Sequence, residues 1–390
     1  MRNKSKTRAA SKRKKVRERS DAPGAAARRG RPLRAETPRQ SKLITREKNP
    51  ANLESPLLFL ESFITPNERF YIRNHFPVPS VNVHSWRLKI GGSVDHALEI
   101  SYDELLNMAS RTQIATLECA GNSRAYLSPK EDGVQWEAGA IGNAEWTGVP
   151  LAAVLDHAGV GANAVEILLE GLDAGEINKA PKSPGEIAFA RSLPIAKARQ
   201  GDVLLAYKMN GAPLPHAHGY PLRAVVPGWY GMASVKWLAR IIALDRPFAG
   251  YFQTLEYTRW ESRDGVPSLV PLDQMQIKTA IFRPARHERV APDAVYRVRG
   301  AAWTGEAEIA KVEVSADGGY TWSPARFLAP PIRNAWSFWE YEWKTPARGT
   351  FRLLASATDS RGITQPPARD KNHRSYAINH YLPVEVTVRG

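Results

Sequence analysis

One segment of the chain could hold a metal ion, and its chemistry depends on the only cysteine, Cys119. The segment reads Glu-Cys-Ala-Gly-Asn-Ser-Arg over residues 118–124. Its small residues let the backbone approach a bulky ligand, and the cationic Arg124 favours the thiolate, the form of cysteine that binds metals. A single thiolate suits a soft metal whose other ligands come from elsewhere. A buried, inert cysteine is the other interpretation of this segment taken alone.

The lone cysteine also narrows the chemistry that the chain can carry. It cannot form a disulfide within the chain, and it excludes a zinc site built from several thiolates. A zinc site at His216 and His218 is disfavoured because no third and fourth ligands lie at the usual spacing. If Cys119 binds a metal, the remaining ligands must come from other groups.

Further segments combine basic, polar and aromatic residues in short runs. They are residues 70–79 (Phe-Tyr-Ile-Arg-Asn-His-Phe-Pro-Val-Pro), 135–136 (Gln-Trp) with 139–146 (Gly-Ala-Ile-Gly-Asn-Ala-Glu-Trp), 218–223 (His-Gly-Tyr-Pro-Leu-Arg), and 227–231 (Pro-Gly-Trp-Tyr-Gly) leading to 234–237 (Ser-Val-Lys-Trp). Together with residues 118–124 they stand in the order typical of the sulfite oxidase family, which the chain resembles over about residues 54–390. Several motifs in order are more specific than any one of them.

The resemblance implies a molybdenum cofactor, molybdopterin, whose metal is held by the dithiolene of one pyranopterin and by the thiolate of Cys119. It also implies a set of residues that bind the pterin ring and its phosphate. These are Asn74, His75, Asp173, His218, Arg223, Ser234 and Lys236. Arginine and lysine in this set suit an anionic cofactor, since one offers a planar fork and the other a point charge. His218 as a plain core histidine is the alternative.

The resemblance further implies a cationic substrate pocket. Arg73 and Arg124 match two of its arginines, Trp136 its aromatic wall and Tyr257 its active-site tyrosine. Arg374, near the C-terminus, is the candidate for a third arginine. Two solvated surface charges are the alternative interpretation of Arg73 and Arg124.

The activity that the resemblance implies is oxidation of sulfite to sulfate by oxygen-atom transfer at a Mo-oxo centre. We expect no haem in this chain, because residues 1–50 lack the His-Pro-Gly-Gly loop of the animal enzymes and no Cys-x-x-Cys-His motif is present. Electrons would then pass to oxygen or to an external acceptor such as a separate cytochrome. A homodimer is expected as well, because the second domain carries the dimer contact in this family.

Hydrophobic patterns predict the elements that position these residues. A capped helix is expected from Ser101, and a buried strand over residues 114–118 runs into Cys119. A helix over 149–155 and strands over 86–90, 165–169 and 222–226 complete a mixed first part. Beyond residue 275, evenly spaced strands over 295–302, 311–315, 337–343 and 351–358 indicate an immunoglobulin-like β-sandwich. The predicted class is therefore α+β, with a catalytic domain over 51–270 and a dimerisation domain over 276–390.

The charge of the chain is concentrated at its start. Residues 1–50 hold 18 Lys and Arg against 4 Asp and Glu, which accounts for +14 of the net charge of +15. This segment has no aromatic residue, so we expect a disordered basic tail. No apolar run reaches the ~18 residues of a membrane span, and no apolar stretch follows the basic segment as in a secretory signal. A cytoplasmic location is the resulting expectation.

Three other functions stay open on the sequence. A related molybdenum reductase, for nitrate or methionine sulfoxide, would share the fold and Cys119, although the paired arginines and the Glu-Tyr-Thr context of Tyr257 favour sulfite. A nucleic-acid-binding protein could act through the basic tail, but the rest of the chain is nearly neutral. The third is a structural relative that binds no cofactor.

Overall fold

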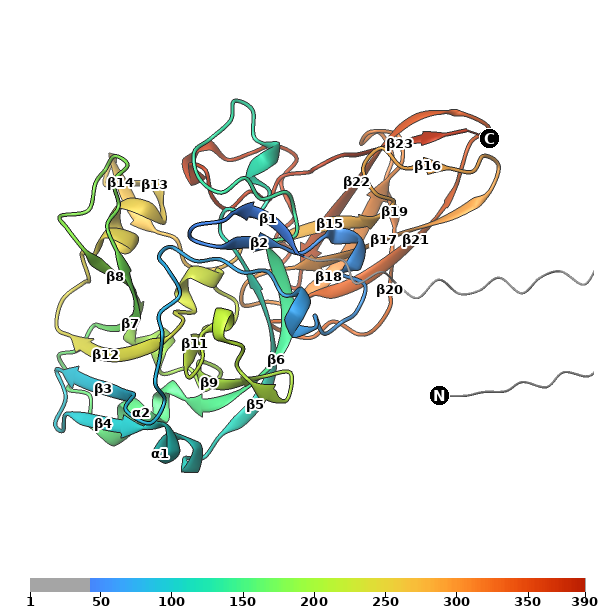
Figure 1. Cartoon of the computed structure of the whole chain (residues 1–390). Helices are drawn as coiled ribbons and strands as arrows, with labels where there is room; N and C mark the ends of the chain where they lie inside the picture. Colours follow the sequence, from blue (N-terminus) through green and yellow to red (C-terminus); the bar gives the residue numbers. More distant parts are fainter. Residues whose placement is uncertain (1–42, 390) are drawn as a thin grey trace, which may run out of the picture. The chain divides into compact units, whose positions relative to one another are not determined.

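The computed structural model describes residues 43–389, which are mostly strands (Figure 1). The α-helices among these residues are short: α1 (Tyr102–Asn107), α2 (Leu151–Ala158) and α3 (Ile195–Ala198). No helix in this part of the chain is long and apolar enough to span a membrane. The start of α1 after Ser101 is confirmed, and α2 begins two residues later than predicted and stops at Gly159. Ser101 caps α1 by accepting from the Glu104 amide at 3.2 Å, and Gly159 ends α2 at a φ of +65°.

The start of the folded part is earlier than expected. The predicted basic tail lies largely outside the described residues, but β1 (Ile44–Glu47) pairs antiparallel with β2 (Asn52–Glu54). The tail boundary at residue 50 was therefore wrong. Arg46 forms an ion pair with the buried Glu54, and Asn52 donates to Glu47 at 2.6 Å, so polar contacts hold this hairpin where apolar residues are scarce.

Two five-stranded sheets, joined to a common apolar core, make up the first part of the chain. The first contains β10 (Ala212–Pro213), β9 (Leu204–Met209), β6 (Ile141–Pro150) and β5 (Arg111–Glu118) in that order, with β11 (Arg223–Val225) also paired to β9. The second has the order β4 (Leu98–Ser101), β3 (Arg87–Gly92), β12 (Leu238–Leu244), β7 (Glu166–Gly175) and β8 (Ile187–Pro194). All pairs are antiparallel except β12 with β3. The strands expected near residues 86–90, 114–118, 165–169 and 222–226 are thus confirmed.

A hairpin of β13 (Thr258–Arg263) and β14 (Val266–Pro271) leads to two further sheets. One has the order β15 (Lys278–Arg283), β17 (Val295–Trp303), β21 (Ser337–Lys344) and β20 (Arg326–Phe327). The other has the order β16 (Arg289–Val290), β23 (Val384–Val388), β22 (Gly349–Asp359), β18 (Ile309–Ser315) and β19 (Ser323–Pro324). Trp339 and Trp343 are buried in the core of these sheets. Trp303 and Trp336 instead join the core of the first part, so the two parts are packed together.

Candidate active site

Cys119 lies at the point where β5 ends and a tight loop begins. The loop is held by backbone bonds, since the Cys119 amide donates to the Ala140 carbonyl at 2.9 Å and the Asn122 amide donates to the Cys119 carbonyl at 2.8 Å. The loop leaves no room for a side chain at Gly121, where a Cβ atom would lie 2.5 Å from the Arg124 guanidinium. Cys119 is 6% exposed, and its thiol lines a pocket. The expected delivery of Cys119 by a buried strand is confirmed.

The pocket, which is partly open to solvent, gathers residues from distant parts of the chain. Most of the residues implied by the family resemblance line it. They are Arg73, His75, Cys119, Asp173, His218, Arg223, Ser234, Lys236 and Tyr257. Both sheets of the first part contribute to the wall, because Cys119 directly follows β5, β7 carries Asp173 and β11 begins at Arg223.

The pocket lining includes a basic cluster formed by the buried Arg223 and His218 and the half-buried Lys236. Arg223 donates to the His218 carbonyl at 3.1 Å and to the Ser234 carbonyl at 3.0 Å, while Lys236 donates to the Ala217 carbonyl at 2.9 Å. Burial lowers the pKa of Arg223 to about 10. Burial, together with the neighbouring Arg223, holds the pKa of Lys236 well below its usual value. Among the described residues neither Arg223 nor Lys236 forms an ion pair with a carboxylate, and an anionic ligand would stabilise such groups.

Asp173 is the acidic residue among the pocket-lining side chains. Burial raises its pKa to about 6, against the opposing effect of Lys236. Its Oδ1 atom is buried without a hydrogen-bond partner among the described residues. An unpaired buried acceptor of this kind indicates a missing donor, such as an N–H group of a ligand.

Tyr257, His75 and Arg73 also line the pocket. His75 Nε2 and the Tyr257 hydroxyl are 2.6 Å apart. Burial and the nearby Arg73 hold the pKa of His75 well below its usual value, so the ring is neutral, and its tautomer sets whether Nε2 accepts from the tyrosine hydroxyl or donates to it. Burial raises the pKa of Tyr257 to about 12, which keeps its hydroxyl protonated at neutral pH. The His75 ring stacks on Phe189 with centroids 4.3 Å apart, which fixes its orientation.

Comparisons with known proteins decide the family of this chain. Residues 75–252 match the oxidoreductase molybdopterin binding domain, and residues 270–389 match the Mo-co oxidoreductase dimerisation domain. Sulfite oxidase of Gallus gallus is 36% identical over 355 residues, which cover 86% of this chain and 75% of that protein. The chain belongs to the sulfite oxidase family.

Other relatives agree with this membership and differ in length. Sulfite oxidase of Arabidopsis thaliana is 31% identical, and the match covers 85% of this chain and 90% of that protein. The mitochondrial sulfite oxidase of Homo sapiens is 34% identical, and the match covers 84% of this chain and 62% of that protein. The chain thus spans about three fifths of the human relative. Among solved structures, the sulfane dehydrogenase SoxCD from Paracoccus pantotrophus matches with a TM-score of 0.76 and 28% identity over 91% of this chain and 92% of that one.

Some residues that the family resemblance implied do not line the pocket. Arg124 is buried, and it donates to the Val134 carbonyl at 3.0 Å and to the Ser375 carbonyl at 3.1 Å. The expectation that Arg124 and Arg73 together bind the substrate anion stays a prediction.

Trp136 and Arg374 are also absent from the pocket lining. Trp136 is fully buried and meets Tyr71 edge-on, with ring centroids 6.5 Å apart. Arg374 donates to the Leu255 carbonyl at 2.9 Å and to the Thr258 hydroxyl at 2.5 Å, both close in sequence to Tyr257. Their assignment to the substrate stays a prediction. Asn74 is likewise not among the residues that line the pocket, but its side-chain oxygen accepts a hydrogen bond from Lys236, which does line it.

Arg191 is a buried charge that the sequence reasoning missed. It is 1% exposed, it donates to the Leu272 carbonyl at 2.8 Å, and its guanidinium carbon lies 5.9 Å from the centre of the Tyr257 ring. Burial lowers its pKa to about 10. The sequence could have indicated it, because Arg191 interrupts the largely apolar run of β8, and a buried arginine is rare unless it has specific partners.

Proposed function

We propose that this chain binds molybdopterin and oxidises sulfite to sulfate, passing the electrons to oxygen or to an external acceptor. The observation that carries the proposal is that one pocket holds both the thiol of Cys119 and the basic cluster. A thiolate is a ligand for a soft metal, and the cluster suits the phosphate of the same cofactor. Membership of the sulfite oxidase family supports the choice of sulfite.

The residues of the pocket fit the cofactor in chemistry as well as in position. Cys119 would hold the metal, and Arg223, Lys236, His218 and Ser234 would hold the phosphate. Asp173 has the unpaired Oδ1 atom that an N–H group of a pterin ring requires. When bound, the cofactor supplies two-electron oxygen-atom-transfer chemistry.

The chain itself contributes charge and hydrogen bonds to the substrate. Arg73 lines the pocket, so its guanidinium can attract a compact oxyanion and offset the loss of its hydration. Tyr257 lines the same pocket, and its hydroxyl can donate to the bound anion when Nε2 of His75 donates to the tyrosine oxygen. The surrounding aromatic residues Phe70, Tyr71 and Phe189 limit access of water to the same space.

The domain organisation belongs to the same proposal. We assign residues 51–270 to an α+β catalytic domain and residues 276–390 to an immunoglobulin-like sandwich that pairs two copies of the chain. The match of residues 270–389 to a dimerisation domain supports this assignment. A separate cytochrome as electron acceptor and a cytoplasmic location stay predictions.

Metal analysis and a substrate panel test the proposal. Purified protein should contain about one molybdenum per chain and should reduce ferricyanide when sulfite is added. A sulfane substrate deserves a parallel assay, because the sulfane dehydrogenase SoxCD shares the fold over nearly its whole length. Protein with full molybdenum content that reduces nitrate or a sulfoxide but leaves sulfite unchanged would refute the proposed substrate, and protein without molybdenum or pterin would refute the proposed cofactor.

A further inference from the structure

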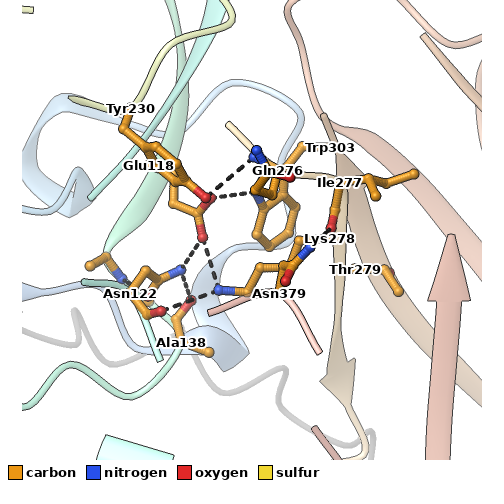
Figure 2. A network of polar contacts seen from close by, with 12 residues as sticks. Glu118, Asn122, Ala138, Tyr230, Gln276, Ile277, Lys278, Thr279, Trp303 and Asn379 are labelled. Atoms are coloured by element: carbon orange, nitrogen blue, oxygen red, sulfur yellow. Dashed lines mark hydrogen bonds and ion pairs between the residues drawn. The ribbon is translucent and has the colours of Figure 1, made fainter. Parts of the chain in front are cut away.

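A buried polar network joins the loop that carries Cys119 to the sheet that contains β15 and β17 (Figure 2). Glu118, the last residue of β5, is 1% exposed and lies at the centre of the network. The Nζ atom of Lys278 lies 2.9 Å from Glu118 Oε1, and the Nε1 atom of Trp303 donates to Glu118 Oε2 at 2.8 Å. Lys278 opens β15 and Trp303 ends β17, so both partners come from the C-terminal part of the chain.

The same network continues around the Cys119 loop. Asn122 donates to Glu118 Oε1 at 3.0 Å and accepts from the Ala140 amide at 3.1 Å, while Lys278 also donates to the Asn122 carbonyl at 3.3 Å. These contacts fix the residues on both sides of Cys119.

A second contact from the C-terminal part lies on the same loop. The Ala377 amide donates to the Ala120 carbonyl at 2.8 Å, and the Ser375 carbonyl accepts from Arg124. Residues of the C-terminal part therefore form hydrogen bonds with this segment at Glu118, Ala120, Asn122 and Arg124.

Stability alone does not explain an ion pair at this position. The side chains of Lys278 and Glu118 are 3% and 2% exposed, and removing two charges from water offsets much of their attraction. An apolar pair of similar volume is often as stable. The charged pair instead fixes the orientation of the Glu118 carboxylate, because Lys278 and Trp303 each donate to a different one of its oxygens.

We propose that Lys278 and Trp303 are positioning residues for the metal ligand Cys119, so that the C-terminal part of the chain fixes the loop that carries this ligand. The proposal rests on the proposed function in one respect, namely that Cys119 binds the metal. It goes beyond that function because it gives the predicted dimerisation domain a role in the geometry of the active site.

The chain contains a matched control pair. Lys197 and Glu306 also join the two parts of the chain through an ion pair of 2.7 Å, in which Lys197 is buried and Glu306 is partly exposed. Lys197 also donates to the Pro227 carbonyl at 3.0 Å. Neither residue lines the pocket or contacts residues 118–124. Lys197→Met should therefore destabilise the protein without altering the metal centre.

Two measurements test the proposal on full-length Lys278→Met, Lys278→Arg, Trp303→Phe and Lys197→Met. The first is hydrogen exchange of the amides of residues 119–124, which needs no metal. We expect exchange to be about tenfold faster in Lys278→Met and Trp303→Phe, because local opening follows the loss of the contacts that close a segment, and to be unchanged in Lys197→Met. The second is the electron paramagnetic resonance signal of Mo(V) after partial reduction by dithionite. The signal should shift in the first two variants, return toward wild type in Lys278→Arg and stay unchanged in Lys197→Met.

The outcomes separate this inference from the proposed function. Equal exchange in Lys278→Met and Lys197→Met, with an unshifted Mo(V) signal at full molybdenum content, would overturn the positioning role. Wild-type protein without molybdenum would instead overturn the proposed cofactor, and the exchange measurement would still decide whether the network orders the loop. If Lys278→Met does not fold, Trp303→Phe decides the question in both measurements, because it removes one donor and leaves the ion pair intact.

Discussion

We predict that the buried His218 of the basic cluster makes the stability of the folded protein depend on pH. His218 is 4% exposed and lines the pocket. Burial, with added repulsion from Lys236 and Arg223, lowers its pKa to about 3. The same histidine titrates near 6.5 in an unfolded chain. Between these two values the unfolded chain binds a proton that the folded protein does not, so stability falls as the pH falls.

The size of the effect follows from the two pKa values. Lowering the pH from 7 to 5 protonates His218 almost completely in the unfolded chain and hardly at all in the fold, which amounts to ~2 kcal/mol of lost stability. His75 acts in the same direction, since its pKa is also lowered. Asp173 acts in the opposite direction, because its pKa is raised to about 6 and it takes up a proton more readily in the folded protein.

A variant isolates the contribution of His218 from these opposing terms. We expect His218→Gln, which keeps a donor toward the Asn67 carbonyl, to lose ~2 kcal/mol less stability than wild type between pH 7 and pH 5. Urea unfolding of cofactor-free protein at the two pH values measures the difference. Equal losses in both proteins would refute the reasoning and would mean that His218 is hydrated or paired. Bound cofactor should reduce the difference, because an anionic phosphate favours the protonated ring.

Further variants test the other parts of the site. Cys119→Ser should abolish sulfite oxidation while leaving the fold intact, since a hydroxyl is a poor replacement for a thiolate at a soft metal; full activity in purified protein would defeat the assignment. Arg73→Gln should lower kcat/KM for sulfite at least ~30-fold, as expected when an anion loses a buried cationic partner, and Arg73→Lys should restore only part of it. Arg124→Gln should instead lower mainly the free energy of unfolding, because Arg124 is bonded to the Val134 and Ser375 carbonyls; equal kcat/KM losses in the two glutamine variants would place both arginines at the substrate. Sedimentation should show a homodimer through residues 276–390, and a monomer at micromolar concentration would count against the proposed pairing.

Local signals in the sequence were sufficient for the elements that deliver the metal ligand. The apolar run before Cys119 predicted β5, and the Ser101 cap with Glu104 predicted the start of α1. These predictions succeed because capping and strand patterns depend on neighbours in the sequence. The hairpin of β1 and β2 was not predicted, because it depends on an ion pair between Arg46 and Glu54 that the composition of the segment does not reveal.

The order of the motifs determined which residues belong to one site, and most of them do line one pocket. The motifs could not determine where each side chain points. Arg124 is five residues after Cys119, yet its guanidinium is bound by carbonyls of Val134 and Ser375, one of them 251 positions away. The ion pair between Glu118 and Lys278 spans 160 positions. Only the tertiary structure brings such partners together, because a buried charge is directed by whichever acceptors or donors packing places around it.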